Sequence, residues 1–224
     1  ESDSLWSYEV GAKTSWLQNR LTLNASAFYI DWKDTQVQVQ VGGLGCSFGG
    51  LSTNVGSVKS RGFEVELNAV PINNLNVAMG VSYIDAEVNE DLQFPGASTV
   101  IAQKGDRMPN IPEWTISALG DYSFPVSSSL DGFVRGDVRY QGNRAANFAP
   151  GNPDRPIKEA FTVVNLRAGV RFDGWEVSGF AENLFDVRPF LRGEPPLANQ
   201  TKGGQVYENT IRPRTLGVRF SGRF

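Results

Sequence analysis

The sequence predicts an all-β fold, specifically a transmembrane antiparallel β-barrel. Apolar and polar residues alternate in many segments, these segments are long, and short and long connections alternate between them. Strict alternation is typical of a β-strand, because successive side chains point to opposite faces. No segment shows a convincing 3.6-residue apolar repeat, so little helix is expected.

The clearest strand ends the chain. Its apolar face carries Leu216, Val218, Phe220 and Phe224, and Arg219 and Arg223 lie on the other face. The same alternation recurs at residues 5–16, 20–32, 60–70, 74–83, 113–124, 130–140, 162–172 and 175–185. The sequence therefore predicts about nine strands, each close to the ~9–11 residues that a tilted strand needs to cross a bilayer.

The connections between these strands alternate in length. Short turns are expected at residues 18–19, 72–74, 127–129 and 173–174, and long polar connections at roughly 41–53, 86–111, 142–160 and 186–210. The Asp-Gly dipeptide at 173–174 favours a tight hairpin. Tight turns at one end and long loops at the other are typical of a membrane barrel.

A soluble β-sandwich is the competing interpretation, since its strands also alternate. Two features favour the barrel. The polar face is rich in Arg, Asp, Glu, Asn and Gly rather than Lys and Glu, as expected for a lumen packed against more protein. Aromatic residues also gather at strand ends, as in the girdles at the two membrane interfaces; they are Trp16, Tyr29, Trp32, Tyr83, Trp114, Tyr122, Phe124, Tyr140, Phe172 and Trp175.

Composition narrows the functional classes. The net charge of −3 disfavours a nucleic-acid binder, and the chain has no histidine for a catalytic triad or a usual zinc site. Glu64 and Glu66 could suggest acid–base chemistry, but two residues apart on one strand face they are interpreted as structural. Cys46 lies in a glycine-rich loop without metal-ligating neighbours. The sequence therefore predicts no enzyme, no cofactor and no metal site.

Motifs in chain order add a family resemblance. The hairpin YEVGAKTSWLQNRLTLNASAFYIDWKDTQV, the strand NVGSVKSRGFEVEL, the motif ENLFD and the ending RPRTLGVRFSGRF follow one another with matching spacing. Together they resemble the C-terminal β-barrel of the TonB-dependent outer-membrane receptors, of the siderophore-receptor type. The resemblance spans essentially the whole chain.

The resemblance implies a larger protein. Residues 1–224 would form the C-terminal part of the β-barrel domain, about the last nine strands of a 22-stranded barrel. The plug domain and the earlier strands would lie outside this chain, and Glu1 would be a truncation or processing point. The last strand would carry the signal that the barrel-assembly machinery reads, at Leu216, Val218, Phe220 and Phe224.

The resemblance also implies a function. Such a receptor lies in the outer membrane of a Gram-negative cell, among its lipids, and takes up a scarce ligand, most commonly a ferric siderophore. The TonB–ExbB–ExbD complex supplies the energy through the plug. Guanidinium and aromatic groups suit anionic chelates, and the best candidates for ligand contacts, near the strand ends, are Arg144, Phe148, Arg188 and Phe190.

The charged residues of the polar face are interpreted as structural, some through cross-strand pairing of opposite charges and the remainder through polar contacts with a plug. They are Glu64, Glu66, Asp121, Arg135, Asp137, Arg139, Arg167, Arg171, Glu176 and Glu182. A small outer-membrane barrel that serves as an adhesin or structural protein, without transport, is the alternative function. An outer-membrane barrel enzyme is disfavoured by the lack of histidine. Cobalamin, nickel chelates and carbohydrates remain open as ligands beside iron chelates.

Overall fold

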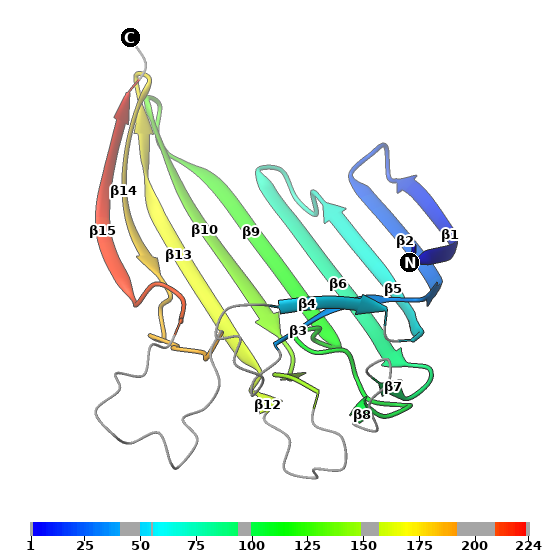
Figure 1. Cartoon of the computed structure of the whole chain (residues 1–224). Helices are drawn as coiled ribbons and strands as arrows, with labels where there is room; N and C mark the ends of the chain where they lie inside the picture. The colour runs from blue at the N-terminus through cyan, green and yellow to red at the C-terminus, as the bar shows by residue number, and fades with distance from the viewer. Residues whose placement is uncertain are drawn as a thin grey trace, which may run out of the picture.

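The computed structural model describes residues 2–40, 50–54, 56–93, 100–148, 157–191 and 209–222. These residues form a nine-stranded sheet in the order β1-β2-β5-β6-β9-β10-β13-β14-β15, and every neighbouring pair is antiparallel (Figure 1). The strands are β1 (Ser4–Trp16), β2 (Leu21–Lys33), β5 (Val58–Ala69), β6 (Leu75–Val88), β9 (Trp114–Ser127), β10 (Leu130–Gln141), β13 (Phe161–Phe172), β14 (Trp175–Glu182) and β15 (Thr215–Gly222). The predicted strands and their simple up-and-down order are confirmed.

Short and long connections lie at opposite ends of the sheet, as predicted (Figure 1). A two-residue turn joins β13 to β14, where Asp173 (φ 42°) and Gly174 (φ 76°) both adopt the left-handed conformation that such a hairpin needs. The long connections contain small antiparallel ladders, which are β3 (Gln36–Gln40) with β4 (Gly50–Asn54), β7 (Leu92–Gln93) with β8 (Val100–Ala102), and β11 (Arg144–Ala145) with β12 (Ile157–Lys158).

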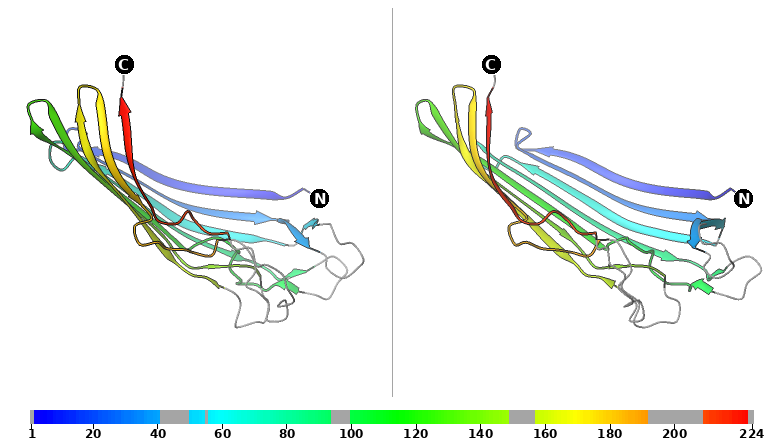
Figure 2. Two further views of the ribbon diagram at one scale, coloured as in Figure 1. Left: turned by 90° about the vertical axis from the view of Figure 1, so that its left-hand side faces the viewer. Right: turned by 60° about the vertical axis from the view of Figure 1, so that its left-hand side comes forward.

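The sheet is curved and open (Figure 2). Among the described strands, β1 pairs only with β2 and β15 pairs only with β14, so the two edges do not meet. Closure into a barrel and a total of 22 strands therefore remain predictions. No helix in the described ranges is long and apolar enough to cross a membrane.

The register keeps apolar residues on one face across the sheet. One continuous row of directly opposed residues runs from β6 to β15; its members are Leu75, Tyr122, Val134, Ala168, Gly179 and Val218. Directly opposed residues share a face of the sheet. A shift of one residue between any two strands would break this row.

Aromatic side chains border the apolar face at both ends. At the end with the long connections, Tyr8 stands 6.5 Å from Tyr29, and Tyr83 stands 4.8 Å from Trp114, between ring centroids. At the other end the close pairs are Tyr122 with Phe124, at 5.8 Å, and Trp175 with Phe220, at 4.9 Å. The rise of about 3.4 Å per residue places Trp114 about 27 Å from Tyr122 along β9. At a strand tilt of about 35–45° this length spans about 19–22 Å along the membrane normal, most of the ~25 Å height of an outer-membrane apolar band.

Trp32 does not follow the predicted girdle. It faces Val58 across the β2–β5 ladder, on the polar face, and its indole nitrogen donates to the Asp3 carboxylate at 2.7 Å. The prediction that Trp32 lies at a strand end is confirmed, but the alternation along β2 points its side chain to the polar face rather than to the apolar face.

Among the described residues, the polar face contains one buried aromatic residue, Phe133 on β10, which is 2% exposed. The guanidinium carbon of Arg171 lies 4.1 Å from the centre of its ring, and that of Arg167 lies 5.7 Å from it. Glu176 forms ion pairs with both arginines. The predicted cross-strand pairing is therefore confirmed here, and Arg135 with Asp121, at 3.9 Å, is a looser example.

Aromatic rings also cover glycines that lie directly opposite on the next strand. The opposed pairs are Phe28 with Gly62, Phe124 with Gly132, Phe180 with Gly217, and Trp175 with Gly222. A methyl group added at Gly62 would lie 2.7 Å from the Phe28 ring and would also collide with the Tyr83 carbonyl oxygen. These glycines are needed for the close approach of a ring, which fixes the pairing of the two strands.

The ENLFD motif closes the connection between β14 and β15. Asn183 is 4% exposed, and its side-chain oxygen accepts from the Val187 amide at 2.9 Å. Its side-chain nitrogen donates to the carbonyl oxygens of Val187, at 2.9 Å, and Arg212, at 3.0 Å. The residues that begin and end this long connection are therefore tied together.

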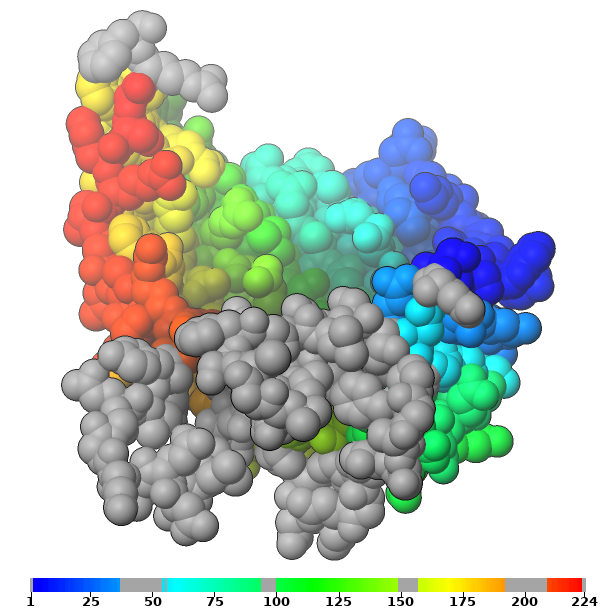
Figure 3. Space-filling model, in the orientation of Figure 1, coloured from blue at the N-terminus to red at the C-terminus, as the bar shows by residue number. Residues whose placement is uncertain are grey.

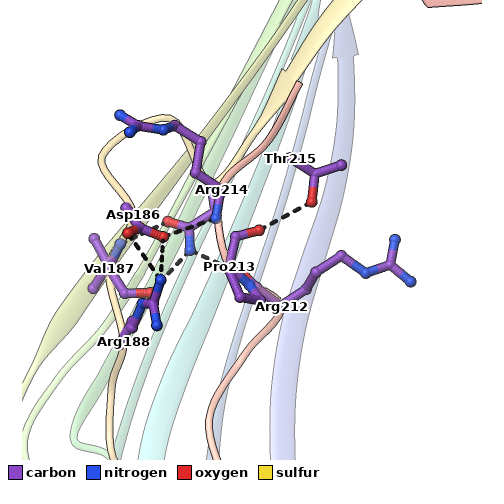
Figure 4. A network of polar contacts seen from close by, with 8 residues as sticks. Asp186, Val187, Arg188, Arg212, Pro213, Arg214 and Thr215 are labelled. Carbon is purple, nitrogen blue, oxygen red and sulfur yellow. Dashed lines mark hydrogen bonds and ion pairs between the residues drawn. The ribbon is translucent and has the colours of Figure 1, made fainter. Parts of the chain in front are cut away.

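Asp186 completes this closure (Figure 4). Its carboxylate accepts from the Arg214 backbone amide at 2.9 Å and from the Arg188 guanidinium at 3.1 Å. The Arg214 amide, followed by Arg188, lowers the pKa of Asp186 below its ordinary value. We call the contacts of Asn183 and Asp186 with residues 187–188 and 212–214 the clasp.

We expect Gly62→Ala to destabilise the assembled barrel of the full-length receptor, because the new methyl group meets backbone and a ring. Overpacking of this kind costs about 1–3 kcal/mol. Gly120→Ala is the matched control, since nothing lies within 4 Å of the added carbon there. The temperature at which the folded band disappears in gel electrophoresis measures the effect. Equal temperatures for the two variants would contradict the role given to Gly62.

We expect the clasp to weaken in acid. A carboxylate whose folded pKa is depressed stabilises above its unfolded pKa of about 3.9, and that contribution disappears as the pH falls through the folded value. Pepsin cleavage within residues 187–214 of the full-length receptor should therefore accelerate below about pH 4. In Asp186→Ala this cleavage should be several-fold faster already at higher pH and depend less on pH. Parallel pH profiles for the two proteins, corrected for pepsin activity on an unstructured peptide, would disprove the role of Asp186.

Candidate functional site

A hollow rich in arginine lies on the polar face, toward the end with the long connections. It has a volume of about 810 Å³ and is lined by residues of β10, β13, β14 and β15 and by residues from the β14–β15 connection. In the space-filling view the β1 and β15 edges flank the hollowed face of the sheet (Figure 3). The cations that line it, which define the arginine hollow, are Arg135, Arg139, Arg167, Arg212 and Arg219.

The hollow carries net positive charge. Its carboxylates are Asp137 and Glu182. Glu182 stands 3.7 Å from Arg212, a weak pair because both side chains are largely exposed. Within the described part of the chain, Arg139 and Arg219 form no hydrogen bond or ion pair. Their guanidinium groups are therefore free to bind an anionic ligand.

The walls of the hollow are fixed by neutral amide groups. The Asn165 side chain donates to the Asp137 carboxylate at 2.8 Å and accepts from the Asn183 backbone amide at 2.8 Å. Asn183 belongs to the clasp, so this chain of hydrogen bonds connects β10 through β13 to the start of the β14–β15 connection. In the described ranges, no three His, Cys, Asp or Glu side chains gather as a metal ion would require.

The long connections have a small apolar core of their own. Val88, Leu92 and Ala102 are buried together, and Phe148 packs against them from the β10–β13 connection. Phe148 therefore joins that connection to the one between β6 and β9. This packing role was not expected for a residue predicted to contact the ligand.

Arg144 and Lys158 lie side by side at the base of these connections. They are opposite each other in the β11–β12 ladder and are 7% and 6% exposed. The Lys158 ammonium donates to the Asn110 side-chain oxygen at 2.6 Å and to the Leu191 carbonyl at 3.0 Å, which ties three long connections together. The Nη1 atom of Arg144 is buried and has no hydrogen-bond partner among the residues that the structure describes.

The predicted ligand residues are not gathered in the hollow. Arg144 is in β11, Phe148 in the apolar core, Arg188 in the clasp, and Phe190 is half-buried just beyond it. None of them lines the arginine hollow. Their contact with a ligand stays a prediction.

Sequence reasoning missed Arg212 as a site residue and assigned Arg139 to charge pairing. Arg139 faces Val163 and Ser117 on its two neighbouring strands, so no carboxylate stands opposite it. Arg219 faces Ser178. A cation on the polar face without an opposed acid is the signal that identifies these residues, and it becomes visible only once the register is known.

The structure describes three of the four residues of the predicted assembly signal. Leu216, Val218 and Phe220 lie on the apolar face of β15 and are 69%, 78% and 65% exposed. Phe224 and Cys46 lie outside the described residues. Recognition by the assembly machinery stays a prediction.

Comparison with known proteins gives a family and curated relatives. The family described as "TonB dependent receptor-like, beta-barrel" matches residues 4–184. The metal-pseudopaline receptor CntO of Pseudomonas aeruginosa is 27% identical over 186 residues, which cover 83% of this chain and 24% of that receptor. The ferric-pyoverdine M114 receptor PbuA of Pseudomonas sp. is 28% identical over 183 residues, 81% of this chain and 21% of that receptor.

Solved structures agree on the fold. The ferric yersiniabactin uptake receptor FyuA from Yersinia pestis superposes with a TM-score of 0.70 at 18% identity, over 96% of this chain and 29% of that one. The siderophore receptor PiuA from Acinetobacter baumannii gives a TM-score of 0.68 at 21% identity, over 96% and 27%. The chain spans about a quarter of the length of the curated relatives it matches. It belongs to the TonB-dependent receptor family, whose β-barrel domain it represents in part.

Proposed function

We propose that the chain is part of an outer-membrane receptor that takes up an anionic metal chelate of the ferric-siderophore class. The observation that carries this proposal is the arginine hollow, whose unpaired Arg139 and Arg219 lie on the polar face below the long connections. Guanidinium groups bind the carboxylate, phenolate or hydroxamate oxygens of such chelates by charge-assisted hydrogen bonds. The names of the relatives, a metal-pseudopaline receptor and a ferric-pyoverdine receptor, support the same ligand class.

The apolar face and its aromatic borders support a position in the bilayer, with lipid against Leu75, Val134 and Val218 and the polar face turned to the lumen. In this proposal the remaining strands complete a 22-stranded barrel, the size of outer-membrane transporters. A plug domain outside residues 1–224 fills the lumen, and the TonB–ExbB–ExbD complex acts on it. The ending with Leu216, Val218, Phe220 and Phe224 serves barrel assembly.

Uptake in the bacterium that encodes the chain tests this function. Deletion of the gene should abolish uptake of at least one radiolabelled iron chelate under iron limitation, and disruption of TonB should have the same effect. Unchanged uptake of a full panel of chelates, together with a loss of surface attachment, would favour the adhesin alternative.

We expect the double variant Arg139→Gln/Arg219→Gln to bind an anionic ferric catecholate about tenfold more weakly than the wild-type receptor, because partly solvated charge pairs contribute up to about 1 kcal/mol each. Binding of an uncharged ferric hydroxamate should change less. Arg214→Gln removes the same charge outside the hollow and is the control. Equal affinity of the double variant and the control for the catecholate would contradict the role of the hollow.

We expect Met79→Lys to reduce folding into the membrane, because Met79 lies on the apolar face midway along β6 between Leu75 and Tyr83. A lysine facing lipid near the bilayer midplane costs about 2–4 kcal/mol. Asn76→Lys places the same charge on the polar face of the same strand and should be tolerated. The fraction of folded full-length receptor in outer membranes distinguishes the two, and equal fractions would argue against lipid contact at Met79.

A further inference from the structure

Arg144 is buried, and none of the described residues offers its charge a partner. Its residue is 7% exposed, and its Nη1 atom is buried without a hydrogen bond to any described residue. Removing a cation from water is costly unless an anion or a set of acceptors replaces the water. Buried polar groups in native proteins are nearly always satisfied, so an unsatisfied one requires a specific explanation.

The backbone holds Arg144 in place from both sides. Before it, the Gly142 amide donates to the Trp114 carbonyl oxygen at 2.8 Å. After it, the Ala145 carbonyl oxygen accepts from the Asn110 amide at 2.8 Å. The guanidinium group is therefore presented by a fixed segment, which reduces the entropy lost when a ligand binds.

A second buried cation lies beside Arg144. It is Lys158, opposite Arg144 in the β11–β12 ladder, and its contacts include the side-chain oxygen of Asn110 and the carbonyl oxygen of Leu191. Burial lowers the pKa of Arg144. A guanidinium group held in such a place interacts with an anion more strongly than it would in water.

We propose that Arg144 is an anion-binding site that takes a carboxylate or phosphate group through two parallel guanidinium hydrogen bonds. The planar fork of arginine fits both oxyanions, and the contact would satisfy the buried Nη1 atom. The site is distinct from the arginine hollow, which Arg144 does not line. The inference rests on the proposed function in one respect, that the long connections face the side from which the ligand arrives.

The anion has two possible sources, an acidic group of the transported chelate or a small free anion such as phosphate. Calorimetry on the purified full-length receptor in detergent separates them, with citrate and inorganic phosphate as probes at constant ionic strength in chloride. The variants are Arg144→Met, which keeps the bulk without the charge, and Arg144→Lys, which keeps the charge without the fork. Arg214→Met is the control for loss of a positive charge outside the site.

We expect the wild-type receptor and the Arg214→Met control to bind citrate equally. Arg144→Met should bind it about ten- to a hundredfold more weakly, the usual effect of a hydrogen bond to a charged group, and Arg144→Lys should be intermediate. Tighter binding of citrate than of phosphate would identify a carboxylate, as on a chelate, and the reverse order a phosphate. The melting temperature of Arg144→Met without either probe should equal or exceed that of the wild type, because the substitution removes an unpaired buried charge.

Three results would overturn the site. The first is a wild-type receptor that binds neither probe, and the second is an Arg144→Met variant that keeps wild-type affinity for citrate. The third is an Arg144→Met variant that melts well below the wild type without ligand, because that would show that Arg144 already has a stabilising partner. The test does not depend on transport. A receptor that binds citrate through Arg144 but takes up no metal chelate would refute the proposed function and leave the anion site intact.

Discussion

The structure depends on one constraint, the register of an antiparallel backbone ladder, which in the β9–β10 pair shifts between Leu130 and Asp131, beside the turn. Each strand of the sheet pairs with the sheet strands that precede and follow it along the chain, so backbone donors and acceptors between paired strands find partners within the sheet. The outer edges of β1 and β15 have no neighbour among the described strands. A hydrocarbon environment requires such pairing, because no water is present to satisfy backbone groups. The same register separates the side chains, with apolar rows on one face and charged rows on the other. Opposed glycine and aromatic residues reinforce it, since a ring that lies directly over the facing residue needs a glycine there, as Phe28 does over Gly62.

The arginines of the polar face fall into two groups, those with ion-pair partners and those without a partner among the described residues. Arg167 and Arg171 are engaged by Glu176 and stack against Phe133, so these cations have partners. Arg139 and Arg219 have none among the described residues. Arg139 lies toward the long connections, opposite Val163, whereas Arg219 lies level with Phe133, opposite Ser178. An anion that enters the hollow from the side of the long connections therefore meets the unpaired Arg139 before the paired Arg167. The clasp, the apolar core around Leu92 and the Lys158 contacts hold the bases of these connections in fixed positions around that entrance.

The sequence predicted much of the fold but little of the site. Alternation, strand length and turn residues such as Asp173-Gly174 are local signals, and they gave the strands, their order and their faces correctly. The structural role of Phe148 depends instead on packing against Val88 and Leu92, which lie in another connection far from it in the sequence. Arg188 contacts Asp186, two residues away, and that carboxylate also accepts from the distant Arg214 amide, which local signals do not reveal. Arg139 was assigned to pairing because acids are common nearby, and only the register shows that Ser117 and Val163 stand opposite it. Phe133 and Trp32 show that an aromatic residue can also serve the polar face.

The division of the sheet into a lipid-facing and a lumen-facing side is the central claim, and spin labels along β10 test it most directly. Single cysteines at positions 134 to 138 of the full-length receptor, with Cys46→Ser as background, would be labelled and reconstituted into lipid bilayers. The account predicts that labels at Val134, Gly136 and Val138 collide mainly with oxygen dissolved in lipid, and those at Arg135 and Asp137 mainly with a water-soluble nickel chelate. Accessibility without alternation, or with the opposite alternation, would contradict it.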